Sequence, residues 1–520
     1  MNSSHLRRLI APILFAALAL TILPQISAQT PQQIQKKEHI RYKVIDVGTF
    51  GGPNSANNGS SPIMNREGVF VGLADTLTPD PYAPNCFFDC FVSHAFEWRN
   101  AALTDLGALP GGYSSFTNAI NSSGQIVGFS QNGLIDAVLG IPEFVAAVWQ
   151  DGRVIDLGTF GGGFSIATAN NDRQQVVGCA INDIPDPFEP TPTGVFYGLG
   201  FEPRQLRAFR WQGKQLQDLG TLGGPDACAT WINERGQIVG TSFTNSIVNP
   251  ATGLPTLGSF LWEDGRILDL GTLGGAVGRA LMINNRGQII GQSSLAETPG
   301  ACVTGDSGTP GCHGFLWDRG ILRDLGTLGG NFSIPNWIND AGEITGVASN
   351  QNEQAVFAFV WKKGAMTNLG TLDGDCFSQA FAINSEGQVA GQSLPCDGST
   401  PRAVLWDDGQ IIDLNVFVPP GSGLLLTDPK IINDAGKIVL AGLLSNGDVH
   451  SVVLIPCEPS EEDCIDSAEV ATSAALSGTA PLALAHPAAT QTNLTPAEIR
   501  DRVRSLMAKH NHRFGALPPK

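Results

Sequence analysis

The residues of this chain that could do chemistry recur at intervals. The string DLGTLGG occurs three times, beginning at Asp218, Asp269 and Asp324. A single glycine-rich string of this kind can cradle a phosphate when a helix follows it, because the N-terminus of the helix then faces the anion. No helical periodicity follows any copy. The repetition therefore predicts an architectural use, in which glycine lets the backbone cross closely between two elements.

The histidines also recur at one position. His94, His313 and His450 stand directly before or within the same short apolar segment of three repeats, whereas a catalytic histidine is normally singular. We expect them to pack within strands or to make satisfied hydrogen bonds. The motifs G-x-S-x-G and H-E-x-x-H are absent from the sequence. The sequence therefore predicts no catalytic residues and a protein that is not an enzyme.

Calcium binding and sugar stacking are two further chemistries to weigh. Asp373–Asp375 and the DSG that begins at Asp306 offer hard oxygen ligands in loops, but the alternating acidic series of a calcium loop is missing. We predict no cofactor, with calcium as the alternative. Trp231 and Trp337 lie outside the main column of tryptophans. A place in the core is the expected role for both, and ligand binding by stacking on a sugar in a channel is the alternative.

These residues belong to a repeat unit with three signature segments. The first is DLG or a close variant, which occurs eight times and begins at Asp46, Asp105, Asp156, Asp218, Asp269, Asp324, Asn368 and Asp413. The second resembles INERGQIVG and begins at Met64, Ile120, Asn170, Ile232, Ile283, Ile338, Ile383 and Ile432. The third resembles AFLW and ends at Trp98, Trp149, Trp211, Trp262, Trp317, Trp361 and Trp406, with a further copy from Ser451 that lacks the tryptophan. Insertions fall almost only between the second and third segments, so they should share one face of the fold.

Each signature segment has the composition of a β-strand. Runs such as SFLW and AFVW are short and rich in β-branched or aromatic residues. Asp264-Gly265 stands between two such runs and predicts a two-residue hairpin. The N-x-x-G of INERGQ predicts a type I turn closed by glycine. Four short strands in a unit of roughly 45 residues are typical of a β-propeller blade.

The two ends of the repeat region predict a closed ring. The region begins with the fourth strand of a unit, RYKVIDVG, and ends with a third strand, HSVVLIP. Pairing of Tyr42–Val47 with Val449–Leu454 would complete one blade from both termini and remove the exposed sheet edges. We therefore predict an all-β, eight-bladed β-propeller of four-stranded blades, with a seven-bladed ring or an open β-solenoid as the alternatives. An open solenoid would need capping segments at its ends, and the repeat region contains none.

The ordered set of DLGTLGG, INERGQIVG and H-A-F or A-F-x-W resembles the bacterial extracellular repeat family named HAF. The resemblance covers about Tyr42 to Pro456. It implies secretion and a propeller-like fold, but the family carries no established activity and no catalytic residues. The histidine of the signature is kept only at His94, His313 and His450, and the third unit has lost the N-x-x-G turn.

The N-terminus predicts export. Residues 1–28 combine the basic pair Arg7-Arg8 with the apolar Leu9–Leu23 and end in small residues, which is typical of a secretory signal peptide. An N-terminal linker over 29–41 would follow. A retained anchor helix and export by the twin-arginine route are the alternatives.

The C-terminal region lies beyond the repeats. Residues 457–493 are rich in Ala, Ser, Thr and Pro and predict a linker. Residues 494–515 predict a capped helix. Its apolar stripe consists of Ile499, Val503, Leu506 and Met507. We expect this helix to dock on its own ring, and binding of another partner is the alternative.

The cysteines predict disulfides in an oxidising compartment. The ten candidates are Cys86, Cys90, Cys179, Cys228, Cys302, Cys312, Cys376, Cys396, Cys457 and Cys464. All except Cys179 and Cys228 stand close to a neighbour in the chain, and these two could pair with each other. The sequence does not fix the connectivity. Metal ligation is the alternative, but paired C-x-x-C spacing with neighbouring histidines is missing.

Together these features predict a secreted, periplasmic or extracellular recognition or scaffold protein, expected to be a monomer, that binds a polysaccharide, a protein or a surface component. Its binding face would be formed by the insertions 73–93, 129–145, 179–207, 243–258 and 292–313. A propeller-based glycan hydrolase or lyase, with acid and base carboxylates at the channel mouth, is the alternative. The balance of 48 Asp and Glu against 31 Lys and Arg disfavours nucleic acid as a partner. We expect no membrane span.

Overall fold

The computed structural model describes residues 40–59, 61–83, 90–137, 139–188, 204–303, 310–351, 355–457 and 464–466. In this part of the chain the regular structure is β-strand, apart from a short 3-10 turn, η2 (Leu414–Phe417). None of these residues forms a helix that could cross a membrane. The predicted signal peptide 1–28, nearly all of the linker 29–41, most of the linker 457–493 and the predicted helix 494–515 lie outside the described residues.

The strands pair antiparallel in groups of four, which we number as blades in chain order. Single parallel pairs, Phe144 with Phe164 and Leu257 with Val277, join blade 2 to blade 3 and blade 4 to blade 5. Blade 1 contains β2 (Gly51–Ala56), β3 (Phe70–Pro79), β4 (Phe91–Arg99) and β5 (Ala102–Asp105), and blade 2 contains β6 (Ser115–Ile120), β7 (Ile126–Ile135), β8 (Pro142–Gln150) and β9 (Arg153–Asp156). Blade 3 contains β10 (Gly161–Asn170), β11 (Val176–Pro185), β12 (Arg204–Gln212) and β13 (Gln215–Asp218). Blade 4 contains β14 (Ala227–Ile232), β15 (Ile238–Val248), β16 (Pro255–Glu263) and β17 (Arg266–Asp269). Blade 5 contains β18 (Gly274–Ile283), β19 (Ile289–Leu295), β20 (Cys312–Asp318) and β21 (Ile321–Asp324). Blade 6 contains β22 (Gly329–Ile338), β23 (Ile344–Asn350), β24 (Val356–Lys362) and β25 (Ala365–Asn368). Blade 7 contains β26 (Asp375–Ile383), β27 (Val389–Pro395), β28 (Arg402–Asp407) and β29 (Gln410–Asp413). Blade 8 joins β30 (Leu424–Ile432), β31 (Ile438–Leu444) and β32 (Val449–Pro456) to β1 (Arg41–Asp46).

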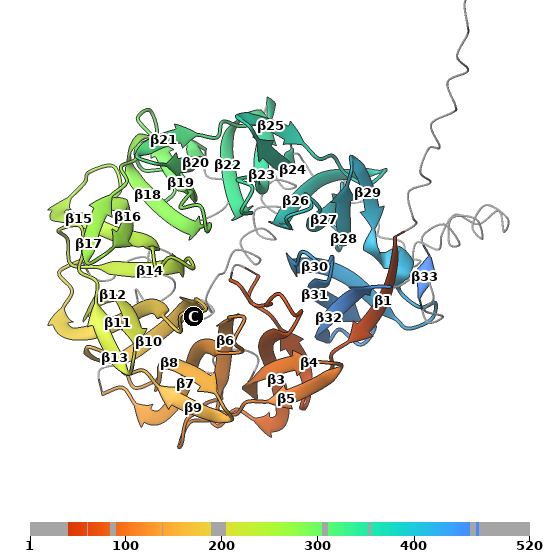
Figure 1. The fold of residues 1–520 in the computed structure, drawn as a ribbon, viewed down its shortest axis with the longest axis horizontal. Helices are drawn as coiled ribbons and strands as arrows, with labels where there is room; N and C mark the ends of the chain where they lie inside the picture. The colour runs from red at the N-terminus through yellow and green to blue at the C-terminus, as the bar shows by residue number, and fades with distance from the viewer. Residues whose placement is uncertain are drawn as a thin grey trace, which may run out of the picture. The chain divides into compact units, whose positions relative to one another are not determined.

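The two ends of the repeat region close the ring in blade 8. Strand β1 pairs antiparallel with β32, and Val44 lies opposite Leu454 while Asp46 lies opposite Val452. Figure 1 shows the sheets arranged in chain order around a central axis, with β1 beside β32. A short strand, β33 (Ile465–Asp466), pairs with the other edge of β1. The prediction of an all-β propeller closed by both termini is confirmed, and the open solenoid is wrong, because pairing the two ends leaves no blade without its fourth strand.

The predicted hairpins form where the sequence places Asp-Gly pairs. Asp264 and Gly265 have φ of 49° and 80° and join β16 to β17, with Glu263 opposite Arg266. Two successive positive φ values match the twist of the flanking strands, which is why this dipeptide is favoured there. In the third unit, which lacks the turn glycine, Gln174 takes the positive φ of 57° itself. The turn therefore survives the loss of its glycine.

The DLGTLGG string makes the crossing from the outer strand of one blade to the inner strand of the next. In the copy after β17, the Asp269 carboxylate accepts the N–H of Gly271 at 2.9 Å, and the Thr272 hydroxyl donates to the Gly275 carbonyl at 2.9 Å. A Cβ on Gly275 would lie 2.7 Å from the Leu295 carbonyl oxygen. The glycine thus lets the crossing run directly against the second strand of the next blade, which is the architectural use predicted from the repetition.

An asparagine in each N-x-x-G turn, and its equivalent in the third unit, ties neighbouring blades together. Its side-chain amide donates to the main-chain carbonyl of the equivalent asparagine in the next blade, over 2.8 to 3.4 Å. The donors are Asn65, Asn121, Asn171, Asn233, Asn284, Asn339 and Asn384, and the last acceptor is Asn433. Between blades 8 and 1, the Lys437 ammonium donates to the Gly68 carbonyl at 3.1 Å. A residue predicted only as a turn former therefore also holds the ring together.

Candidate recognition surface

The three signature histidines are paired with the aspartates of the DLG segments. Nδ1 of His94 lies 2.9 Å from Asp105, Nδ1 of His313 lies 2.8 Å from Asp324, and Nδ1 of His450 lies 2.9 Å from Asp46. In blades 3 and 7 an arginine takes the same place, in the pairs Arg207–Asp218 at 2.9 Å and Arg402–Asp413 at 3.4 Å. The prediction of satisfied hydrogen bonds is confirmed, and the shared position gives these histidines a structural role.

The His450–Asp46 pair joins the two ends of the repeat region and shifts the pKa of both groups. Burial alone would raise the pKa of Asp46, but hydrogen bonds from His450 and the Gly48 N–H, with the charge of His450, hold it below its ordinary value. The hydrogen bond to Asp46 raises the pKa of His450 against the opposing effect of burial. The pair is therefore an ion pair across the closing sheet at mildly acidic pH.

Trp231 and Trp337, the two residues considered for stacking on a sugar, lie against each other. They come from the inner strands β14 and β22, two blades apart, and their rings meet edge to face with centroids 5.6 Å apart. Both side chains are half-buried. Trp337 also packs on the cluster that contains Val47 and Ile431 and on the cluster that contains Leu414. This packing accounts for both residues without a ligand, and their stacking on a sugar stays a prediction.

The described carboxylates of the Asp373–Asp375 loop form no cation site. Asp375 is 3% exposed and makes an ion pair with Arg402 at 2.9 Å, so its charge is already neutralised. Asp306 lies outside the described residues. Within the described ranges, no group of three or more His, Cys, Asp or Glu side chains could hold a metal ion.

Among the described residues, the cysteines form disulfides between the pairs that their positions suggest. The bonded pairs are Cys179–Cys228, Cys302–Cys312, Cys376–Cys396 and Cys457–Cys464. Cys90 is also disulfide-bonded, while its predicted partner Cys86 lies outside the described residues. Cys179 and Cys228 are fully buried and join β11 to β14, so this bond links blade 3 to blade 4. Disulfides of this number are typical of proteins from oxidising compartments.

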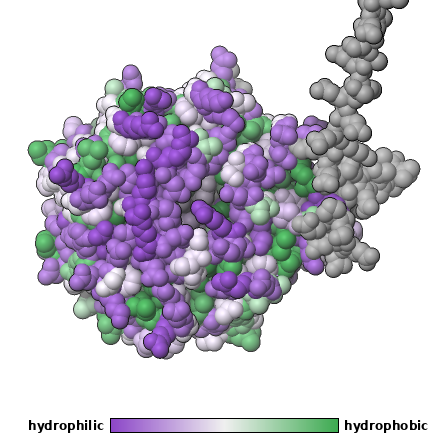
Figure 2. Space-filling model, viewed as in Figure 1, coloured by the Kyte–Doolittle hydropathy of each residue, from purple (hydrophilic) through white to green (hydrophobic). Residues whose placement is uncertain are grey.

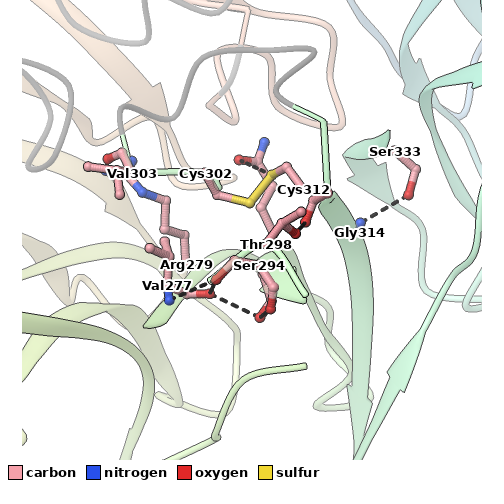
Figure 3. The surroundings of a disulfide bond; sticks show 12 residues. Val277, Arg279, Ser294, Thr298, Cys302, Val303, Cys312, Gly314 and Ser333 are labelled. Atoms are coloured by element: carbon pink, nitrogen blue, oxygen red, sulfur yellow. Dashed lines mark hydrogen bonds between the residues drawn. A yellow bond between two sulfur atoms is a disulfide. The ribbon is translucent and has the colours of Figure 1, made fainter. Parts of the chain in front are cut away.

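The disulfide Cys302–Cys312 fixes the insertion of blade 5. Figure 3 shows Arg279, from the inner strand β18, reaching up to this loop, where its guanidinium donates to the Val303 carbonyl at 2.9 Å. The Thr298 hydroxyl donates to the Gly311 carbonyl at 3.1 Å. The loop is therefore held at both ends and against the inner strand of its blade.

The insertions are not equal around the ring. The second strands of blades 1 to 4 (β3, β7, β11 and β15) have ten or eleven residues, whereas those of blades 5 to 8 (β19, β23, β27 and β31) have seven. The Gly224 N–H donates to the Phe243 carbonyl at 3.0 Å, so the insertion of blade 4 rises on the same side as the DLGTLGG crossing. Because all blades repeat this topology, the insertions share one face, which we call the loop face.

Four aliphatic side chains on the loop face are exposed to solvent. Leu77, Leu134, Ile184 and Ile247 stand at the ends of the four long strands and are 50 to 76% exposed. The face of the ring in Figure 2 is mostly hydrophilic, with hydrophobic side chains as separate spots towards the periphery. Sequence reasoning missed these four residues because it treated the insertions as loops. The recurring Asn-x-Leu or Asn-x-Ile at the strand ends was the available signal for three of them.

A buried carboxylic acid lies at the base of the loop face. Asp226 follows the DLGTLGG crossing into blade 4 and is 2% exposed. Burial, reinforced by the charge of Asp186, raises the pKa of Asp226 to about 7. One of its oxygens accepts the Leu206 N–H at 2.8 Å, and the other has no hydrogen-bond partner in the described part of the chain. The equivalent positions in other repeats are not acidic, and sequence reasoning gave Asp226 no role.

Comparisons with known proteins give no family for this chain. No protein family model matches the sequence, and no curated protein sequence matches it either. Among solved structures, TolB from Acinetobacter baumannii is similar with a TM-score of 0.28 and 12% identity, covering 65% of this chain and 81% of TolB. The gluconolactonase XC5397 from Xanthomonas campestris has a TM-score of 0.26 and 12% identity, over 55% of this chain and 89% of that one. The polysaccharide lyase Uly1 has a TM-score of 0.32 and 11% identity, over 64% and 85%. Likeness this weak carries no argument about activity.

Proposed function

We propose that this chain is a secreted recognition or scaffold protein of the HAF-repeat type, without enzymatic activity, that binds a polysaccharide, a protein or another surface component through its loop face. The observation that supports this most is the concentration of long, exposed insertions on one face of a rigid ring. A rigid scaffold that carries its variable loops on one side is the usual arrangement of a binding protein.

An exposed tyrosine pair offers a first contact on this face. Tyr113, which is 45% exposed, meets Tyr82 edge to face at 5.9 Å between ring centroids. Tyr82 belongs to the insertion of blade 1 and Tyr113 to the crossing into blade 2. Tyrosines combine a broad apolar ring with a polar tip, and they are frequent anchors in protein and sugar recognition.

The test is a binding screen of the exported protein against glycans and surface proteins, with and without calcium. For any ligand found, Tyr113→Ala should weaken binding at least tenfold. Asn285→Ala, on the opposite face, is the matched control and should leave the affinity unchanged. Equal effects of both variants, or turnover of a glycan by the native protein, would contradict the proposal.

The alternative, a glycan hydrolase or lyase, has one supporting observation. Asp226 holds its proton near neutral pH, which is the property of a general acid. Because Asp226 is only 2% exposed, direct contact between its carboxyl group and a substrate is disfavoured. Glycan turnover that is abolished by Asp226→Asn but retained by Tyr113→Ala would establish this alternative.

A further inference from the structure

Six aliphatic side chains are exposed to solvent at the ends of the long second strands, on the loop face of four successive blades. We call this set the aliphatic rim, and it consists of Leu77, Leu134, Ile135, Ile184, Ile247 and Val248, which are 49 to 76% exposed. Large apolar side chains exposed in this way gain free energy when a partner covers them, because water is a poor solvent for them. In blades 5 to 8, the only large hydrophobic residue of comparable exposure among the described residues is Ile321, on an outer strand.

The rim is held in shape by local hydrogen bonds. The N–H groups of Leu134, Ile184 and Ile247 each donate to the side chain of the asparagine two residues earlier, at 2.8 to 2.9 Å. Three neighbouring blades therefore present the aliphatic side chain from the same local turn. A preformed surface of this kind loses little conformational freedom on binding.

The surroundings of the rim are acidic. Asp183 is exposed beside Ile184, and Glu143 and Asp186 are partly exposed on the insertions of blades 2 and 3. The neighbouring Arg204 makes an ion pair with Asp136 at 2.8 Å, so its charge is offset. An occupant of the rim should therefore be aliphatic on one side and basic around it.

We propose that residues 494–515 of this same chain dock on the aliphatic rim. This segment has the apolar stripe of Ile499, Val503, Leu506 and Met507. It also has five basic residues, Arg500, Arg502, Arg504, Lys509 and Arg513, against two acidic ones. The whole chain has a net charge of −17, so the segment is opposite in sign to the ring that it would contact. Its pattern of aliphatic and basic residues matches what the rim requires.

The position at which the chain leaves the ring is compatible with this contact. Strand β33 ends at Asp466 beside β1 in blade 8, which is next to blade 1, the first blade with a long second strand. Residues 467–493 separate this point from the segment. A chain of that length has a root-mean-square span of about 30 Å if it behaves as a random coil and a fully extended reach of about 90 Å. Tethering also gives the segment a high effective concentration at the rim.

The test is site-specific photocrosslinking in the full chain. A benzophenone amino acid in place of Ile247 should cross-link to residues 494–515 of the same molecule, identified by mass spectrometry in the monomer band. The matched control carries the same group in place of Leu268, which is 51% exposed on the outer strand β17 of the same blade, and it should give no such product. Adding Val503→Glu should reduce the Ile247 cross-link at least tenfold while the thermal unfolding of the ring is unchanged.

Two outcomes would overturn the proposal. Cross-links from position 247 that join two copies of the chain, or join the chain to another molecule, would assign the rim to an external partner. No cross-link to residues 494–515, in a protein that unfolds like the native one, would show that the segment does not reach the rim. Neither result would contradict the proposed function, which is tested separately by ligand binding and the Tyr113→Ala variant.

Discussion

Replacing Asn284 by Ala should destabilise the ring strongly, because this side chain joins blade 5 to blade 6. Its amide donates to the Asn339 carbonyl and to the Gln288 side chain, both at 3.0 Å. Its oxygen accepts the N–H of Gln288 at 2.9 Å and of Arg286 at 3.1 Å. Asn284 is 5% exposed, so water cannot readily replace these partners.

The magnitude follows from the groups that lose their partner. Two main-chain groups, the Asn339 carbonyl and the Gln288 N–H, are left buried without a hydrogen-bond partner, which costs about 1 kcal/mol of stability each. The loss of the remaining hydrogen bonds costs about 1 kcal/mol more. The expected loss in free energy of unfolding is about 3 kcal/mol. The matched control is Asn285→Ala in the same turn. Asn285 is exposed: its amide donates to Asp340 at 3.1 Å and its oxygen accepts the Glu234 N–H at 3.0 Å. Water can replace both partners at this exposed site, so replacing Asn285 should cost about 0.5 kcal/mol.

The assay is denaturant unfolding of both variants and the native protein, followed by tryptophan fluorescence. Asn284→Ala should lower the midpoint markedly with an unchanged slope, and Asn285→Ala should barely move it. Equal destabilisation by the two variants would refute the idea that the turn asparagine ties the blades together.

Three further predictions concern ring closure, the blade 3 to blade 4 disulfide and the crossing loop. The pKa of His450 is raised and that of Asp46 is lowered, so their ion pair stabilises the fold between about pH 4 and about pH 6.5. This stabilisation is lost at higher pH, where His450 loses its proton, and at lower pH, where Asp46 gains one. His450→Ala should therefore reduce the free energy of unfolding more at pH 5.5 than at pH 8.5, by up to about 1 kcal/mol for this partly exposed pair, and a pH-independent loss would argue against it. The double replacement of Cys179 and Cys228 by Ala opens a link of 49 residues and should cost about 4 kcal/mol in denaturant unfolding; a loss below 1 kcal/mol would show that β11 and β14 are held by packing alone. Gly275→Ala places a Cβ 2.7 Å from a carbonyl oxygen and should cost about 2 kcal/mol in the same measurement, whereas a neutral result would mean that the crossing is loose.

The sequence was informative wherever a short signal determines a local structure. Asp264-Gly265 predicted its hairpin because both residues tolerate positive φ. The missing strands at the two ends predicted that Tyr42–Val47 pairs with Val449–Leu454, since a blade left incomplete at one terminus can be filled only by the other. The structure confirms this pairing and places Val44 opposite Leu454. Cys179 and Cys228 were left over and could pair, and the structure joins them.

The sequence was less informative where a contact depends on a residue in another blade. The turn role of Asn284 is local, but its bond to Asn339 spans 55 residues and appears only when two blades are side by side. The same holds for Trp231 and Trp337, whose rings meet across two blades. The raised pKa of Asp226 was also beyond sequence reasoning, because it arises from burial that the ring as a whole creates.

The central claim is that the two ends of the repeat region share one blade, because the common loop face depends on this closure. The most direct measurement places spin labels at Lys43→Cys and Ile455→Cys, which are opposite each other in β1 and β32. In the described part of the chain every native cysteine is disulfide-bonded, so the new thiols can be labelled selectively. Antiparallel neighbours have Cα atoms about 5 Å apart, and the account predicts strong dipolar broadening of the spectrum that disappears on unfolding. A native protein whose labels show no broadening would contradict it.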